Sequence, residues 1–268
     1  MMAKLSVQTK KALTGLARGV GAAAFWIAVW AVAARIVGLK LILPSPAQTF
    51  RRLGELLTGT HFYLVTLASL GRVLLGTLLA VLCGILLAAA AAASKTVDAL
   101  LSPVVTIVRA TPVVSFIIIA FLWLGNAALP IFISFLMVFP LIFTNVREGL
   151  RQTPPELLRM AKVFRLSPWT KLRRIYAPSA APYFFSAVRS AFGLSWKAGV
   201  AAEVLVYTPT SIGAEISLSR SALETVDLFA WTATIILLSL VIEFVFSRAV
   251  SLLGKRLEVK PTDAGNPD

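Results

Sequence analysis

The chain has 268 residues, of which 58% are hydrophobic, and its mean hydropathy is +0.84. This composition excludes an ordinary soluble domain, in which about half of the residues are apolar, and predicts a polytopic membrane protein with one membrane domain. The formal net charge of +14 does not indicate a nucleic-acid-binding protein, because cytoplasmic loops of membrane proteins collect Lys and Arg and no aromatic-and-basic binding module is present.

The residues that usually carry chemistry are scarce. Cys83 is the only cysteine and His61 the only histidine, so neither an internal disulfide nor a His/Cys metal site is predicted. No phosphate-binding GxxxxGK[ST] loop occurs, which means that the chain is not itself an ATPase. We therefore predict no catalytic residues, no metal, no cofactor of its own and no enzymatic activity.

The N-terminal region allows two interpretations. Four basic residues precede a short apolar run, and Ala31-Val32-Ala33 resembles a signal-peptidase site. The same features describe a first transmembrane helix whose N-terminus lies in the cytoplasm. We expect this helix to be retained, with cleavage as the alternative.

Six membrane spans are predicted, since each needs roughly 20 mostly apolar residues. They run from Val20 to Leu39, from Val73 to Ala93, twice within Ala110 to Val146, from Tyr183 to Tyr207 and from Leu228 to Ser247. The uncharged stretch from Ala110 to Val146 is too long for one span. A turn at Asn126 to Pro130 divides it into two short helices joined by an outer hairpin.

The charges of the loops orient these spans. The loop from Arg147 to Pro182 is strongly basic, whereas the loop from Thr208 to Asp227 is acidic on balance. The positive-inside rule then places both termini in the cytoplasm. The loop after the first span is basic although it lies outside, and we interpret Pro46 to Leu57 as a short amphipathic helix on the outer surface.

The predicted organisation is an all-α membrane protein in three parts. Residues 1–19 form a cytoplasmic segment, residues 20–253 form the six-helix domain with a cytoplasmic loop at 151–182, and residues 254–268 form a disordered cytoplasmic tail.

The second span carries small residues at every fourth position, namely Gly76, Ala80, Gly84 and Ala88. Such a face lets helix backbones approach closely in lipid. We favour packing inside the bundle, and a contact with another subunit is the alternative.

The loop between the fourth and fifth spans has the most informative pattern. Pro154 and Pro155 precede Glu156 and allow a helix to begin there. From Glu156 to Leu166, polar and apolar side chains separate onto two faces. Ser167-Pro168 then predicts a second short helix, which ends near Tyr176, and Pro178 and Pro182 mark the return to the membrane.

Two roles suit this helix pair. It could lie on anionic lipid, held by its Lys and Arg side chains. Lipid alone does not require two short helices with a defined turn, however, whereas a projection that inserts into a soluble partner does.

At this point the chain resembles the permease subunit of a bacterial binding-protein-dependent ABC importer with the type I fold. The resemblance covers about Leu43 to Leu253. LPSPAQTF, TPVVSFIIIAFLWLG and RRIYAPSAAPYFFSAVRSAFGLSWKAGVAAEVL are similar to the nitrate, sulfonate and taurine branch of these permeases. That branch also includes importers of vitamin precursors. The resemblance implies a location in the bacterial inner membrane.

In such permeases the loop carries a Glu-Ala-Ala, a Gly four residues later and a Pro before the next span, and it forms the coupling helix that docks on the ATPase. The resemblance implies ATPase-coupling roles for Glu156 and for the residues at the signature positions, which are Arg159, Met160, Ala161, Arg165 and Pro178. The match is imperfect. Only Ala161 is kept from Glu-Ala-Ala, and Arg165 stands at the Gly position. An arginine cannot make the contacts of a carboxylate, so we expect a partner with compensating acidic residues, with a degenerate subunit as the alternative.

Two ionisable residues lie inside the fifth span, where charges are costly and are functional candidates. Lys197 and Glu203 are about 9 Å apart along the helix axis and on different sides of it. Each is expected to meet a partner on another helix or an aqueous cavity. A role in the translocation path and a structural ion pair both remain open. Arg35, Arg72, Arg109 and Arg189 lie near span ends and can extend to the interface.

The resemblance implies an importer subunit that works by alternating access. Its expected partners are a dimer of ATPase subunits, which bind the ATP, a periplasmic or lipid-tethered solute-binding protein, a second copy of the chain and membrane lipid. Lys197 would suit an anionic solute such as a sulfonate or nitrate, although vitamin precursors are an alternative. The competing hypothesis is a secondary transporter driven by an ion gradient, against which stands the absence of an inverted repeat.

Overall fold

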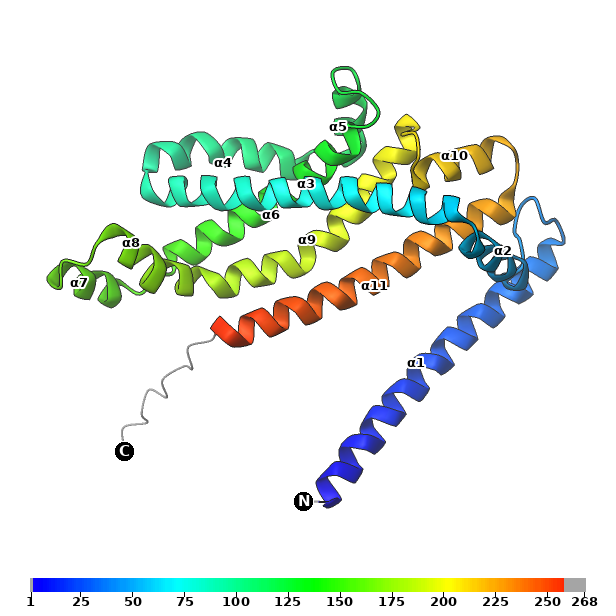
Figure 1. Ribbon diagram of the computed structural model, residues 1–268, viewed down its shortest axis with the longest axis horizontal. Coiled ribbons are helices and arrows are strands. Elements are labelled where there is room, and N and C mark those ends of the chain that lie inside the picture. Colours follow the sequence, from blue (N-terminus) through cyan, green and yellow to red (C-terminus); the bar gives the residue numbers. More distant parts are fainter. Residues whose placement is uncertain (1, 258–268) are drawn as a thin grey trace. The chain divides into compact units, whose positions relative to one another are not determined.

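The computed structural model describes the backbone of residues 2–257 and the side chains of residues 18–248. Within this part of the chain every regular element is helical, which confirms the predicted all-α class (Figure 1). The chain divides into two compact units, and each is described separately. Unit 1 comprises Met1–Phe62 and Leu218–Thr234, and unit 2 comprises Tyr63–Ser217 and Ile235–Asp268.

Unit 1 is built around two helices and the loop between them. These are α1 (Met2–Val37) and α2 (Pro46–Thr58). Ser45 caps α2 through a capping box with Gln48, and Pro46 fits the first helical turn, where no N–H is needed. The short helix predicted after the first span is therefore present.

Side chains of unit 1 attach α2 and its loop to the start of α11 (Thr225–Leu257). Arg52 donates two hydrogen bonds to the carboxylate of Asp227, at 2.7 and 2.8 Å. These bonds raise the pKa of the Arg52 guanidinium above its ordinary value. Thr225 donates a hydrogen bond to the carbonyl of Leu41, and the ring of Trp30 stacks on that of Phe229. Arg52, one of the basic residues of this outer loop, is thus paired with an acidic residue of its own unit.

Three helices form the core of unit 2. They are α3 (Thr60–Ala93), α6 (Leu129–Arg151) and α9 (Ala177–Val206). A row of buried aromatic and branched side chains on α6, including Val138, Ile142 and Phe143, packs between the other two helices. Helices α3 and α9 also carry the residues of a buried polar network described below.

The small residues of α3 lie in that core. Gly76, Ala80, Gly84 and Ala88 are all buried. A Cβ added at Gly76 would collide with the backbone carbonyl of Ile131 on α6, and one at Gly84 would lie 2.8 Å from the side chain of Ile142. The absence of side-chain atoms at these two glycines is what allows α3 and α6 to approach so closely.

The third span differs from the prediction. The expected loop after Ala93 is instead helix α4 (Lys95–Ala110), and α5 (Val113–Phe121) has only nine residues. The two helices are bent by 103° at Thr111-Pro112. Proline disfavours helical backbone at the preceding residue, and Thr111 is indeed extended. The polypeptide is therefore sharply bent here and does not form a straight helix that begins at Ala110.

Four helices of the described residues have the length and apolar character of a membrane span, or five if the bent α4–α5 pair counts as one. Helix α9 has 30 residues but is not among them. Its length includes prolines, serines and charged side chains, which lower its hydropathy. The predicted count of six is not confirmed by these helices.

The return to the membrane also differs from the prediction. After α7 (Pro155–Val163) and α8 (Pro168–Lys171) comes a π-helical turn, η1 (Leu172–Tyr176), which continues directly into α9. Pro178 lies in the first turn of α9 and Pro182 inside it. Pro178 has no N–H and cannot donate a helical hydrogen bond. Just before it, the N–H of Ala177 donates to the carbonyl of Leu172, five residues earlier, and this π-type turn accommodates the proline. The prolines therefore do not separate two helices.

The ends of the chain extend further in helical form than expected. Helix α1 begins at Met2, and α11 continues to Leu257, beyond the expected end of the last span. The C-terminal part of the predicted tail, residues 258–268, lies outside the described residues.

Candidate functional site: the α7 loop and the buried end of α9

Helix α7 is almost entirely exposed. Val163 is 78% exposed and Phe164 71%, and Leu157 and Met160 are exposed as well. Ala161 is the one buried residue of α7. Glu156 and Arg159 are also exposed and have no ion pair within the described residues. An apolar and charged surface of this kind is typical of a contact with another molecule.

The end of α7 explains the position at which the family signature has a glycine. Arg165 has φ +49°, in the left-handed region. The N–H of Leu166 donates to the carbonyl of Ala161, and the N–H of Arg165 donates to that of Lys162. This is a Schellman motif, in which glycine is preferred because a Cβ is strained there. The sequence analysis treated Arg165 as a change of charge, but the position is first of all a conformational one.

Ser167 begins the second helix as predicted. Its hydroxyl accepts a hydrogen bond from the N–H of Thr170, and Pro168 occupies the first helical position. The turn between α7 and α8 is thus defined by a left-handed residue followed by a cap. Both sides of this turn are therefore specified by local chemistry.

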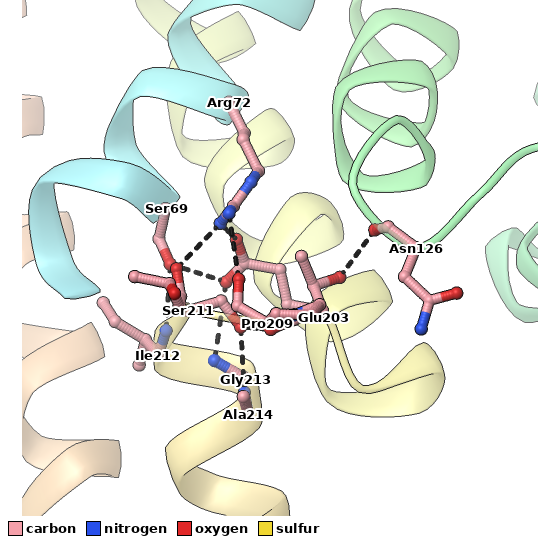
Figure 2. Close-up of polar contacts among 11 residues, drawn as sticks. Ser69, Arg72, Asn126, Glu203, Pro209, Ser211, Ile212, Gly213 and Ala214 are labelled. Carbon is pink, nitrogen blue, oxygen red and sulfur yellow. Dashed lines mark hydrogen bonds and ion pairs between the residues drawn. The ribbon is translucent and has the colours of Figure 1, made fainter.

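The second candidate site surrounds Glu203, near the end of α9 (Figure 2). Its side chain is 0% exposed. One carboxylate oxygen accepts a 2.7 Å hydrogen bond from Ser69, and the other forms a 3.2 Å ion pair with Arg72, both on α3. Glu203 therefore has the partner on another helix that its position in a span required. Arg72, which was expected to extend to the interface, instead points to Glu203.

The same residues hold the loop between α9 and α10 (Ile212–Ser221). Arg72 donates to the carbonyls of Pro209 and Thr210, and the N–H of Gly213 donates to Glu203. No larger residue fits at Gly213, because an added Cβ would collide with Glu203 itself.

A contact from the α5–α6 loop completes this network. The side-chain amide of Asn126 donates to the carbonyls of Val206 and Tyr207, and Thr208 donates back to the Asn126 carbonyl. Asn126 was predicted only as a turn residue. No signal in the sequence pairs residues that are some 80 positions apart.

Lys197 lies in a different environment from Glu203. Its side chain is exposed, and it has no ion pair or hydrogen bond within the described residues. The adjacent Trp196 is fully buried and donates from its indole N–H to the carbonyl of Ile235 on α11. Trp196 therefore lies in the core, whereas Lys197 lies on an open face of α9. Lys197 and Glu203 do not form one site.

Comparison with known proteins identifies the family. Residues 80–259 match the model of the "binding-protein-dependent transport system inner membrane component" family. The chain is 36% identical over 149 residues to the bicarbonate transport system permease protein CmpB of Synechocystis sp.. The matched region covers 55% of this chain and 53% of that relative, which is about half of its length.

A second relative matches over a longer stretch. The nitrate import permease protein NrtB of Synechococcus elongatus is 31% identical over 191 residues, which covers 67% of this chain and 68% of the relative. Among solved structures, the chain is similar to the crystal structure of an amino acid ABC transporter with histidines, with a TM-score of 0.60 and 16% sequence identity. The superposition covers 73% of this chain and 94% of that chain. This similarity indicates a common fold. The chain therefore belongs to the family of inner membrane components of binding-protein-dependent transport systems.

Proposed function

We propose that this protein is the membrane-spanning permease subunit of an ATP-driven importer. The observation that carries the proposal is the α7 loop. In a chain of this family, an exposed amphipathic helix lies between α6 and α9, and a Schellman motif and a helix cap define the turn at its end. Such a projection has the size and chemistry to transmit a movement of a soluble partner to α6 and α9.

The partner at α7 is an ATPase subunit with an acidic groove. Leu157, Met160 and Phe164 supply apolar anchors, while Arg159 and Arg165 supply charges that are unpaired within the described residues. An unpaired arginine that is buried in an interface is costly unless it meets a carboxylate. The groove should therefore carry acidic residues opposite these two arginines.

The other parts of the assembly follow from the family and remain part of the proposal. Two permease copies and two ATPase subunits form the transporter, and a solute-binding protein delivers the solute. The cycle is alternating access, with Lys197 on the open face of α9 lining the solute path. The solute is a small anion, which is supported by the relatives named for bicarbonate and nitrate and by the cationic side chain on that face.

The first test is affinity purification from native membranes, followed by reconstitution of the purified complex with its binding protein in proteoliposomes. We expect an ATPase subunit in roughly equal amount and uptake of nitrate or bicarbonate that stops when the catalytic residues of the ATPase are inactivated. Mixed-tag purification of two permease copies tests the homodimer. Uptake that persists without ATP hydrolysis would contradict the proposal.

A secondary transporter driven by an ion gradient gains no support from the geometry. That hypothesis depended on Lys197 and Glu203, and Glu203 is enclosed by Ser69, Arg72 and Gly213. Uptake driven by a proton or sodium gradient in the absence of any ATPase would restore it.

A further inference from the structure

Unit 2 contains a half-open cavity of about 320 Å³ between α4, α6 and α9. Its volume is at the lower end of the range of small-molecule sites, roughly 300–1,000 Å³. Leu136, Met137 and Leu194 form apolar walls, and Arg109, Thr144 and Asn145 contribute polar groups. None of these residues belongs to the α7 loop or to the Glu203 network, so the cavity is a separate feature.

The charge that lines the cavity is positive. Arg109, in the last turn of α4, is its single charged residue, and its guanidinium has no ion pair or hydrogen bond within the described residues. The acidic residue on the same helix, Asp98, is already bound to Arg147 and Arg151 at 3.0 and 2.6 Å. The positive charge of Arg109 is therefore not neutralised by the chain.

Two other polar side chains that line the cavity each already donate one hydrogen bond. Thr144 donates to the carbonyl of Pro140, and Asn145 donates one amide hydrogen to that of Leu141. The second amide hydrogen of Asn145 remains a donor, since an Asn side chain has two. Together with the forked donors of the guanidinium, it forms a set that matches the oxygens of a small planar or tetrahedral oxyanion.

A second cation lies next along α9. Lys197 is three residues beyond Leu194, which places it on the same side of the helix about 4.5 Å further along the axis. Both side chains are exposed. The cavity thus opens beside a face that carries another positive charge.

We propose that this cavity is a binding site for a small oxyanion, with the Arg109 guanidinium as its main donor and Lys197 as the neighbouring charge that attracts the anion. The proposal rests on the proposed function, because it names the class of solute that the permease passes. It also makes Arg109, which precedes the bend between α4 and α5, the residue through which the anion contacts this bent helix pair.

The site is tested in the assembled complex with a cysteine placed in its wall. The sole native cysteine is replaced by Cys83→Ala, and Thr144→Cys introduces the probe. The probe is modified with an anionic methanethiosulfonate reagent and with a cationic one, and each rate is divided by that for a free thiol. We expect the anionic reagent to be favoured by about tenfold or more, since a unit charge a few ångströms away in a medium of intermediate dielectric supplies that preference.

The matched variants are Arg109→Gln and Arg189→Gln, both made in the Thr144→Cys protein. Arg189 is likewise exposed but does not line the cavity. We expect the preference for the anionic reagent to collapse with Arg109→Gln and to persist with Arg189→Gln. Equal effects of the two variants, or no preference at the outset, would overturn the proposal.

Protection by solute completes the test. Nitrate should slow the modification of the cysteine introduced by Thr144→Cys, and chloride at equal ionic strength should slow it much less. Equal protection by the two anions would indicate charge screening and would overturn the proposal of an oxyanion site. These rates require neither ATP nor uptake. A cavity with the expected charge and protection in a protein that shows no ATP-driven import would leave the site intact and refute the proposed function instead.

Discussion

The α7 loop and the Glu203 network use the same residue types in opposite ways. In the α7 loop, Glu156 and Arg165 are exposed and have no ion pair within the described residues. Near the end of α9, Glu203 is fully buried and its carboxylate is bonded to Ser69, Arg72 and Gly213. A charged side chain in this chain therefore has a structural role where it is enclosed, and it is available to a partner where it is exposed. Four substitutions test how enclosed and exposed positions differ, in order of the size of the expected effect on stability.

The largest effect is expected from Arg72→Ala, which leaves the Glu203 carboxylate buried beside Ser69 without its cation. Breaking one partner of a buried ion pair typically costs about 3–5 kcal/mol. The free energy of unfolding in mixed micelles measures this loss. Arg51→Ala is the control, because its pair with Glu55 is exposed and should contribute little. A similar loss in the two variants would mean that the Glu203 pair is not structurally special.

The next effect is expected from Gly76→Ala, which places a methyl group against the Ile131 carbonyl and forces α3 away from α6. Overpacking of this kind costs about 1–3 kcal/mol. Gly71→Ala on the same helix is a matched control, because no atom lies within 4 Å of the added Cβ. If both variants unfold like the original protein, the contact between α3 and α6 is looser than described.

A gain in stability is expected from Arg165→Gly, because glycine adopts the left-handed backbone without strain. The penalty for other residues is about 1–2 kcal/mol. Arg165→Ala is the control, since it removes the same charge but retains the Cβ. Hydrogen exchange at Leu166 should slow in the glycine variant alone. Coupled ATPase activity then distinguishes the conformational role of Arg165 from a role in docking to the ATPase. An equal loss of this activity in both variants would mean that the arginine side chain contacts the ATPase.

The smallest effect on stability is expected from Met160→Gln, since a substitution on an exposed surface usually changes the free energy of unfolding by less than about 0.5 kcal/mol. The same substitution should weaken association with the ATPase, because it removes an apolar anchor. Co-purification yield measures this association. Leu57→Gln, at an exposed apolar position of α2, serves as the control. Full retention of the ATPase by Met160→Gln would argue against docking at this face of α7.

Local features were predictable from the sequence because their causes lie within a few residues. Ser45-Pro46 and Ser167-Pro168 begin helices at the expected positions, because a side-chain cap and a proline act on the next turn alone. The break at Thr111-Pro112 had the same kind of signal, which the hydrophobic run obscured. The apolar composition and the family resemblance likewise determined the class of protein, and both were confirmed.

The tertiary structure alone decided how the charges and the small residues are used. Arg72 and Glu203 are 131 positions apart, and only the packing of α3 against α9 brings them together. The burial of Gly76 and Gly84 against α6 was one of two alternatives until the helices were placed. The continuity of α9 through Pro182 also departs from local propensity, which disfavours a proline inside a helix. Sequence determines what each segment can form, whereas long-range contacts determine which side chains are enclosed and which remain free to bind.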